Sequence, residues 1–122
     1  MGYNTKSSSR ADGKYYENIA VTYLKNQGYD IIMQNFYCKF GEIDIIGYNE
    51  NYICFIEVKY RKHTKSGYAV EAVNKKKQLN IIKVANYYLL KHQIVTDFPI
   101  RFDVVAIDNN DISLIKNAFG GL

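Results

Sequence analysis

Apolar residues recur at helical spacing early in the chain and predict its first helix. They are Tyr16, Ile19, Ala20, Tyr23 and Leu24. Asp12 is placed to cap this helix and Gly28 to end it, because glycine readily adopts the conformation that follows a helix C-terminus. The polar, Ser-rich residues 1–10 are predicted to form a flexible tail, which leaves 11–122 as a single domain.

The next three apolar runs have the composition of β-strands. They cover residues 29–36, 42–48 and 52–60, and the stretch YNEN between the last two is typical of a turn. Short connections of this kind join antiparallel neighbours. The three runs therefore predict an antiparallel meander.

A second, longer helix is predicted over residues 69–91, followed by strands over 101–107 and 112–115. Its apolar face would consist of Gln78, Ile81, Ile82, Ala85, Tyr88 and Leu89. A strand-helix-strand crossover is right-handed and joins parallel strands, so the sheet should be mixed. The predicted fold class is α/β, with an αβββαβ core in which helices flank a mixed central sheet.

The charge of the chain is unevenly distributed. The net charge is +4, yet residues 59–91 contain nine Lys or Arg residues against a single acid, Glu71. The remaining residues are acidic on balance. A basic half beside an acidic half suits a protein that binds a polyanion and also holds cations, although a solvated helix face would give the same basic run.

Cysteine content and hydropathy indicate the compartment. Cys38 and Cys54 stand in no zinc-binding spacing, and two thiols make no disulfide framework, so we expect a reduced, cytoplasmic setting. The N-terminus lacks the apolar segment of a signal peptide, and no apolar run approaches the ~20 residues of a membrane span. Membrane association is therefore not expected.

Acidic residues interrupt the second and third strands at positions that should be buried. Alternation places Glu42, Asp44 and Ile46 on one face of the second strand. If the loop between the second and third strands holds an even number of residues, antiparallel pairing brings Asp44 and Glu57 together on that face. Like charges repel strongly at reduced dielectric and lose hydration, so these carboxylates need a positive partner.

That partner could be a metal ion or the neighbouring basic residues. Carboxylate oxygens favour Mg²⁺ or Mn²⁺, which Asp44, Glu57 and the main-chain carbonyl of Val58 would ligate. Lys59 would then orient or deprotonate a water for attack on a phosphodiester. Alternatively, Lys59 and Arg61 neutralise the carboxylates without any metal.

The pattern Asp44…Glu57-Val58-Lys59 across a β-hairpin resembles the PD-(D/E)xK nuclease superfamily, which has a restriction-endonuclease-like fold. The stretches "GEIDII" (41–46), "FIEVKYRK" (55–62) and "RFDVVAI" (101–107) more closely resemble the YraN-like family of small bacterial proteins, related in fold to archaeal Holliday junction resolvases. The resemblance implies that Asp44 and Glu57 are metal ligands and that Lys59 is the catalytic lysine. Glu17 matches an acid of the first helix that helps hold the metal or its water shell.

The function expected from these features is metal-dependent endonuclease activity on nucleic acid, on DNA in preference to RNA and including branched DNA. Arg61, Lys62, Lys76 and Lys77 are the residues expected to contact the nucleic-acid backbone. A homodimer would suit paired cuts in a junction. The alternatives are a non-catalytic nucleic-acid-binding domain of the same fold and a plain interaction module.

Several other polar residues have two interpretations. Glu42 could support the metal site or be an ordinary loop acid. Arg101 and Asp103, two apart on one strand face, are interpreted as a structural ion pair. Tyr60, Tyr68 and Tyr87 could stack on unpaired bases, with packing as the preferred interpretation.

Overall fold

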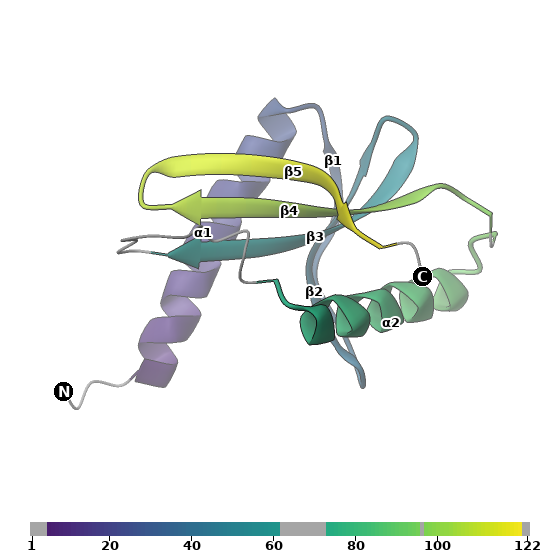
Figure 1. Cartoon of the computed structure of the whole chain (residues 1–122), viewed down its shortest axis with the longest axis horizontal. Helices are drawn as coiled ribbons and strands as arrows, with labels where there is room; N and C mark the ends of the chain where they lie inside the picture. Colours follow the sequence, from purple (N-terminus) through teal and green to yellow (C-terminus); the bar gives the residue numbers. More distant parts are fainter. Residues whose placement is uncertain (1–4, 62–72, 96, 121–122) are drawn as a thin grey trace.

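The computed structural model describes residues 5–61, 73–95 and 97–120 and contains two helices and five strands (Figure 1). The elements are α1 (Thr5–Asn26), β1 (Asp30–Cys38), β2 (Gly41–Asn49), β3 (Tyr52–Arg61), α2 (Lys75–Lys91), β4 (Ile100–Asp108) and β5 (Asp111–Phe119). This order matches the predicted arrangement of helices and strands.

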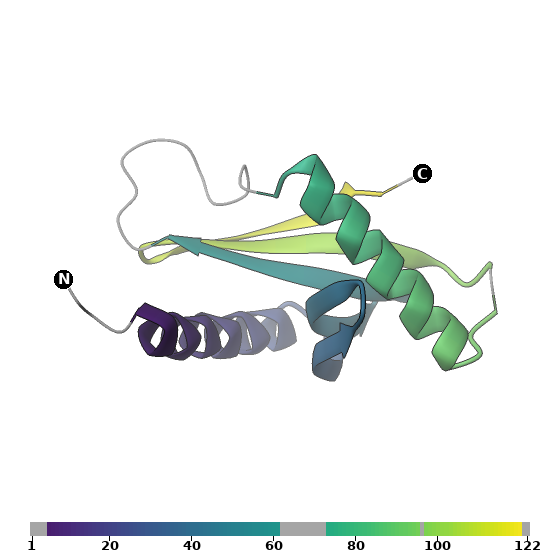
Figure 2. The same cartoon turned by 90° about the horizontal axis from the view of Figure 1, so that it is seen from below.

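The five strands form one mixed sheet in the order β1-β2-β3-β4-β5. Strands β3 and β4 are parallel, as the crossover through α2 requires, and the other neighbours are antiparallel. Figure 2 shows α1 and α2 on opposite sides of the sheet. The predicted α/β fold with an αβββαβ core is confirmed.

Each face of the sheet buries its own apolar cluster. The cluster next to α1 includes Ala20 and Leu24 of the helix with Ile45, Cys54 and Ile56 of the sheet. On the α2 side, the helix contributes Ile81, Val84, Ala85 and Tyr88, and the sheet contributes residues that include Ile43, Ile46, Ile53 and Phe55. The central strand β3 is therefore covered on both faces, as its sequence predicts.

The ends of three elements differ from the predictions. Helix α1 begins at Thr5 and not at the Asp12 cap, because neither Asp12 nor Gly13 removes a backbone N–H or forbids helical geometry. Helix α2 begins at Lys75, since Val73 and Asn74 before it are not helical, and the predicted start at Ala69 lies outside the described residues. Asn74 has an extended backbone and caps the helix by accepting a hydrogen bond from the Lys77 N–H at 2.9 Å.

Strand β5 extends to Phe119, four residues beyond the predicted end. Its register against β4 shifts between Phe102 and Val104, and Asn117 there adopts a positive φ of 54°. The Asn117 N–H donates to Asp103 Oδ1 at 2.9 Å, so the irregular position still has a hydrogen-bond partner. Across the described ranges, neither helix is long and apolar enough to cross a membrane.

Candidate active site at the fork between β2 and β3

The candidate site lies where β2 separates from β3. Pairing between these strands runs from Asn49 and Tyr52 to Ile45 and Ile56, whereas β2 stays paired with β1 as far as Gly41. Asp44 is therefore the first residue of β2 beyond the shared ladder. Its Oδ2 accepts a hydrogen bond from the Val58 N–H at 2.8 Å, so the side chain bridges the fork.

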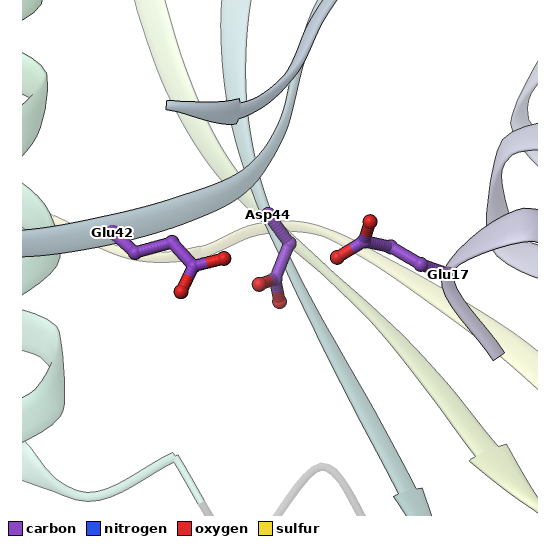
Figure 3. Close-up of side chains that lie close together, drawn as sticks. All are labelled: Glu17, Glu42 and Asp44. Carbon is purple, nitrogen blue, oxygen red and sulfur yellow. The ribbon is translucent and has the colours of Figure 1, made fainter. Parts of the chain in front are cut away.

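Three carboxylates meet at this fork and are called the acidic cluster below: Glu17 of α1 with Glu42 and Asp44 of β2. One oxygen from each lies within 4.8 Å of the other two. Figure 3 shows the three side chains converging from the helix and the strand. Residues from different elements, far apart in sequence, thus form one oxygen-rich site.

Asn35 of β1 fixes the position of Glu17. Its Nδ2 donates to Glu17 Oε1 at 3.0 Å. Asn35 has a φ of 55°, and it is skipped in the pairing of β1 with β2, where Gln34 pairs with Ile45 and Phe36 with Ile43. Asparagine tolerates this left-handed conformation better than most residues, so the strand can turn its side chain toward α1.

A cavity of about 410 Å³ opens onto the acidic cluster. Besides the three carboxylates, it is lined by Gly13 and Lys14 of α1 and by Asn35 and Tyr37 of β1. A Cβ added at Gly13 would meet nothing within 4 Å, so this wall of the cavity is open. The carboxylates are therefore accessible to a small ligand.

Burial and mutual repulsion raise the carboxyl pKa values at the fork. Burial, followed by the nearby charge of Glu57, raises the pKa of Asp44 to about 8, although the hydrogen bond from Val58 opposes the shift. Burial and then the charge of Glu17 raise the pKa of Glu42. The protein environment thus disfavours the ionised forms of both β2 carboxylates.

Glu57 adjoins the acidic cluster on the α2 side of β3. It is almost fully buried, and its Oε2 lies 3.5 Å from Lys77 Nζ at the start of α2. Burial raises the pKa of Glu57, while the charges of Lys77 and Lys59 act in the opposite direction. Lys59 lies two residues along the same strand and so projects to the same side.

These residues fit a hard divalent cation. Carboxylate oxygens are the ligands that Mg²⁺ and Mn²⁺ prefer, and raised carboxyl pKa values are the expected signature of a site whose balancing positive charge comes from an ion. Glu17, Glu42 and Asp44 would hold the ion, with Glu57 beside them. The predicted ligands are Asp44, Glu57 and the Val58 carbonyl, with Glu17 in support. The carboxylates that lie together are Asp44, the predicted supporting Glu17 and, in addition, Glu42.

A second polar cluster, the arginine network of Tyr29, Asn49, Arg101 and Asp103, lies at the opposite end of β2. The predicted pair is confirmed: Arg101 Nε lies 2.9 Å from Asp103 Oδ1. Arg101 also donates to Tyr29 Oη at 3.0 Å and to Asn49 Oδ1 at 2.7 Å. Tyr29 in turn donates to Asp103 Oδ2 at 2.7 Å, so the buried charges are balanced and hydrogen-bonded.

Residues 16–107 match the model of the uncharacterised protein family UPF0102. The chain belongs to this family. A UPF0102 protein of Caldicellulosiruptor bescii is 48% identical over 113 residues, covering 88% of this chain and 95% of that protein. One from Acetivibrio thermocellus is 47% identical over 124 residues (93% and 95% covered), and one from Legionella pneumophila strain Corby is 42% identical over 109 residues (88% and 92% covered).

Membership of UPF0102 confirms the family part of the resemblance seen in the sequence. The matched residues include the acidic cluster together with Glu57, Lys59 and Lys77.

The remaining site residues predicted for this UPF0102 chain are spread along two elements. Arg61 ends β3 and is partly exposed, whereas Lys62 lies outside the described residues. Lys76 is exposed in the first turn of α2, and Lys77 next to it contacts Glu57. Of these residues, Lys77 is joined to the acidic site through its ion pair with Glu57.

Sequence reasoning missed Lys14, Asn35 and Tyr37 and left Glu42 undecided. Two signals were present. Lys14 lies three residues before Glu17, which places both on one face of a helix, and Asn35 is a turn-forming residue inside an apolar strand. The position of Tyr37 at the cavity could not be predicted from the sequence, because it depends on the three-dimensional path of the β1–β2 hairpin.

Proposed function

We propose that this protein is a metal-dependent endonuclease that hydrolyses phosphodiesters of nucleic acid, DNA in preference to RNA. The observation that carries the proposal is the gathering of the Glu17, Glu42 and Asp44 carboxylates at the fork, within reach of an open cavity. The likeness of Asp44…Glu57-Val58-Lys59 to the PD-(D/E)xK pattern supports the same reaction. The free thiols of Cys38 and Cys54 agree with a reducing, cytoplasmic setting.

Each residue has a distinct part in the proposed reaction. A bound Mg²⁺ or Mn²⁺ would supply Lewis-acid stabilisation of the phosphoryl oxygens and lower the pKa of a water. Asp44, Glu17 and Glu42 would hold the ion, and the Val58 N–H orients the Asp44 carboxylate by a hydrogen bond. Lys59 takes part in water activation and offsets the negative charge that develops as water attacks phosphorus and a P–O bond breaks.

Helix α2 supports nucleic acid as the substrate class. It carries five lysines and no acidic residue, and its first turn lies beside Glu57. Cations in the first turn of a helix are disfavoured by the helix dipole, so an interaction with phosphates would explain their placement. The same observation favours the second candidate, a nucleic-acid-binding domain that does not cleave.

The test combines metal binding with cleavage. Mn²⁺ and Mg²⁺ are titrated calorimetrically into the wild type, Asp44→Asn and Glu57→Gln, and the same proteins are incubated with supercoiled, single-stranded and branched DNA. We expect saturable binding and metal-dependent nicking by the wild type, with nicking at least about a hundredfold slower in both variants. Asp30→Asn is the matched control, because Asp30 is an exposed strand carboxylate distant in sequence from the fork.

Two outcomes would contradict the proposal. Absence of metal binding at millimolar concentrations would mean that the lysines already neutralise the carboxylates. DNA binding that falls steeply with salt, without nicking at any metal concentration, would favour the non-catalytic candidate.

A further inference from the structure

A second pocket lies between the tip of the β1–β2 hairpin and the outer face of α2. It has a volume of about 300 Å³ and is lined by Phe40, Lys83, Asn86, Tyr87 and Leu90. Its apolar residues are unusually exposed: Phe40 and Tyr87 at 39% each and Leu90 at 77%. Scattered apolar residues on a surface are ordinary, but two aromatic rings and a leucine around one pocket suggest a binding site.

Lysines surround these rings. Lys39 Nζ lies 5.4 Å and Lys83 Nζ 6.0 Å from the centroid of the Phe40 ring. Lys91 Nζ lies 6.0 Å from the ring of Phe36, which in turn contacts Tyr87 with 6.2 Å between ring centroids. Since α2 has no acidic residue, the surface has positive charge next to open aromatic rings.

We propose that this pocket binds an unpaired base of single-stranded or branched nucleic acid. Aromatic side chains in a positively charged groove are the usual means of holding single strands, because the base stacks on a ring while the lysines contact its phosphates. The Asn86 amide at the pocket can both donate and accept hydrogen bonds at a base edge. The pocket thus offers a partner for each part of a nucleotide.

The charge distribution favours nucleic acid over a second copy of the chain. In a two-fold dimer, the same surface patch of both copies forms the interface. Lys39, Lys83 and Lys91 of one copy would then face the lysines of the other copy. Like charges placed opposite one another oppose association. A polyanion has the complementary charge and needs no such arrangement.

The position of the pocket links it to the acidic cluster. Tyr37 lines the cavity of the acidic cluster and Phe40 lines the base pocket, so the two sites lie on either side of one hairpin tip. Tyr37 and Phe40 are three positions apart along the chain, so their Cα atoms are at most about 10 Å from each other. Resting on the proposed endonuclease function, the inference is that an unpaired nucleotide held at Phe40 and Tyr87 directs the neighbouring phosphodiester toward the carboxylates.

The test measures binding separately from cleavage. Fluorescence anisotropy is used with a labelled oligothymidine, an oligouridine and a blunt DNA duplex, in chelator and in an Asp44→Asn background. Tyr87→Ala and Phe40→Ala should each weaken single-strand binding about tenfold and change duplex binding much less, whereas Tyr87→Phe should bind as the parent does. Tyr15→Ala is the matched control, because Tyr15 is an exposed tyrosine of α1 that lines neither site.

Comparable loss on duplex and single strand, or no loss in Phe40→Ala, would overturn the assignment. So would a dimer in sedimentation that dissociates on Tyr87→Ala, since the pocket would then be a subunit interface. Thermal unfolding of each variant shows whether Tyr87→Ala lowers stability by removing the contact between Tyr87 and Phe36. Phe40→Ala leaves that contact in place. Because no step needs metal or nicking, failure of the endonuclease proposal would leave these results interpretable.

Discussion

The acidic cluster and the arginine network lie toward opposite ends of β2 and differ in how their charge is balanced. In the arginine network, a buried guanidinium meets a buried carboxylate, and Tyr29 and Asn49 take up further hydrogen bonds. Burial acts to lower the pKa of Arg101, yet its hydrogen bonds to Asp103 raise that pKa overall. The network therefore needs nothing from outside the protein.

The acidic cluster has the opposite balance. Glu17, Glu42 and Asp44 lie together, and among the described residues an ion pair at this end of the sheet joins Lys77 to Glu57, at 3.5 Å on the α2 side. Burial raises the pKa of Asp44, Glu42 and Glu57 alike. Burying these carboxylates together is costly unless a ligand supplies positive charge. This supports the proposed function at this end of β2, whereas the arginine network stabilises the fold at the other end.

The largest expected effect comes from breaking the balanced network. Arg101→Leu should lower the free energy of unfolding by about 3–5 kcal/mol, because it leaves the Asp103 carboxylate buried without its cation. Urea denaturation at pH 7 measures this. Metal binding at the fork should be unchanged in any fraction that remains folded.

Arg101→Leu combined with Asp103→Leu provides the control. Removing both charges should recover part of the lost stability, since apolar replacement of a buried pair is often close to neutral. A loss below about 1 kcal/mol in the single variant would mean that the network contributes little to folding.

The structural network was predictable because it depends on simple strand geometry. Arg101 and Asp103 are two residues apart in a regular strand, so their side chains share a face. The same alternation separates Ile53 and Phe55, in the cluster on the α2 side, from Cys54 and Ile56, in the cluster on the α1 side. In regular strands that are buried on both faces, the sequence thus predicts which side chains share a face.

The acidic cluster was only partly predictable because β2 is irregular there. Alternation predicts that Glu42, Asp44 and Ile46 share a face, but Ile43 and Ile46 both pack on the α2 side, and the Asp44 carboxylate meets Glu17 of α1. The simple two-residue repeat fails where β2 leaves β3 beyond Ile45. Glu42 and Asp44 do lie together as alternation predicts, whereas the turn of Asn35 toward Glu17 could not be predicted from it.

An intermediate effect, of opposite sign, is expected at the acidic cluster. Asp44→Asn should stabilise the metal-free protein by about 1–3 kcal/mol at pH 8, because asparagine can still accept the Val58 hydrogen bond but has no charge to bury. The pKa of Asp44 rises from an ordinary 3.8 to about 8 on folding. The contribution of the protonated Asp44 carboxyl to the free energy of unfolding is therefore fully present below pH 4, and it is lost as the pH rises to about 8.

Urea denaturation of both proteins in chelator, at pH 5 and pH 8, measures this difference. The wild type should be less stable at pH 8 than at pH 5, and the variant should show a smaller decrease. Adding Mn²⁺ at a hundred times its dissociation constant should stabilise only the wild type, by about 2.7 kcal/mol. If Asp44→Asn unfolds the protein without metal, its carboxylate is a structural partner and the contrast between the two clusters fails.

The smallest expected effect concerns Lys77, which partly compensates the acidic site. Lys77→Met should destabilise the metal-free protein by about 0.5–1 kcal/mol at pH 8, since Lys77 is 45% exposed and its ion pair with Glu57 is screened by water. At pH 4 the effect should disappear, because the raised pKa of Glu57 leaves that carboxyl protonated. Lys76→Met, at the exposed neighbouring position, is the matched control and should change stability at neither pH.

Calorimetry should also show that Lys77→Met binds Mn²⁺ a few-fold more tightly, because it removes a cation that competes for Glu57. Weaker Mn²⁺ binding in this variant would instead make Lys77 a support of the metal site and reduce the difference between the two ends of β2.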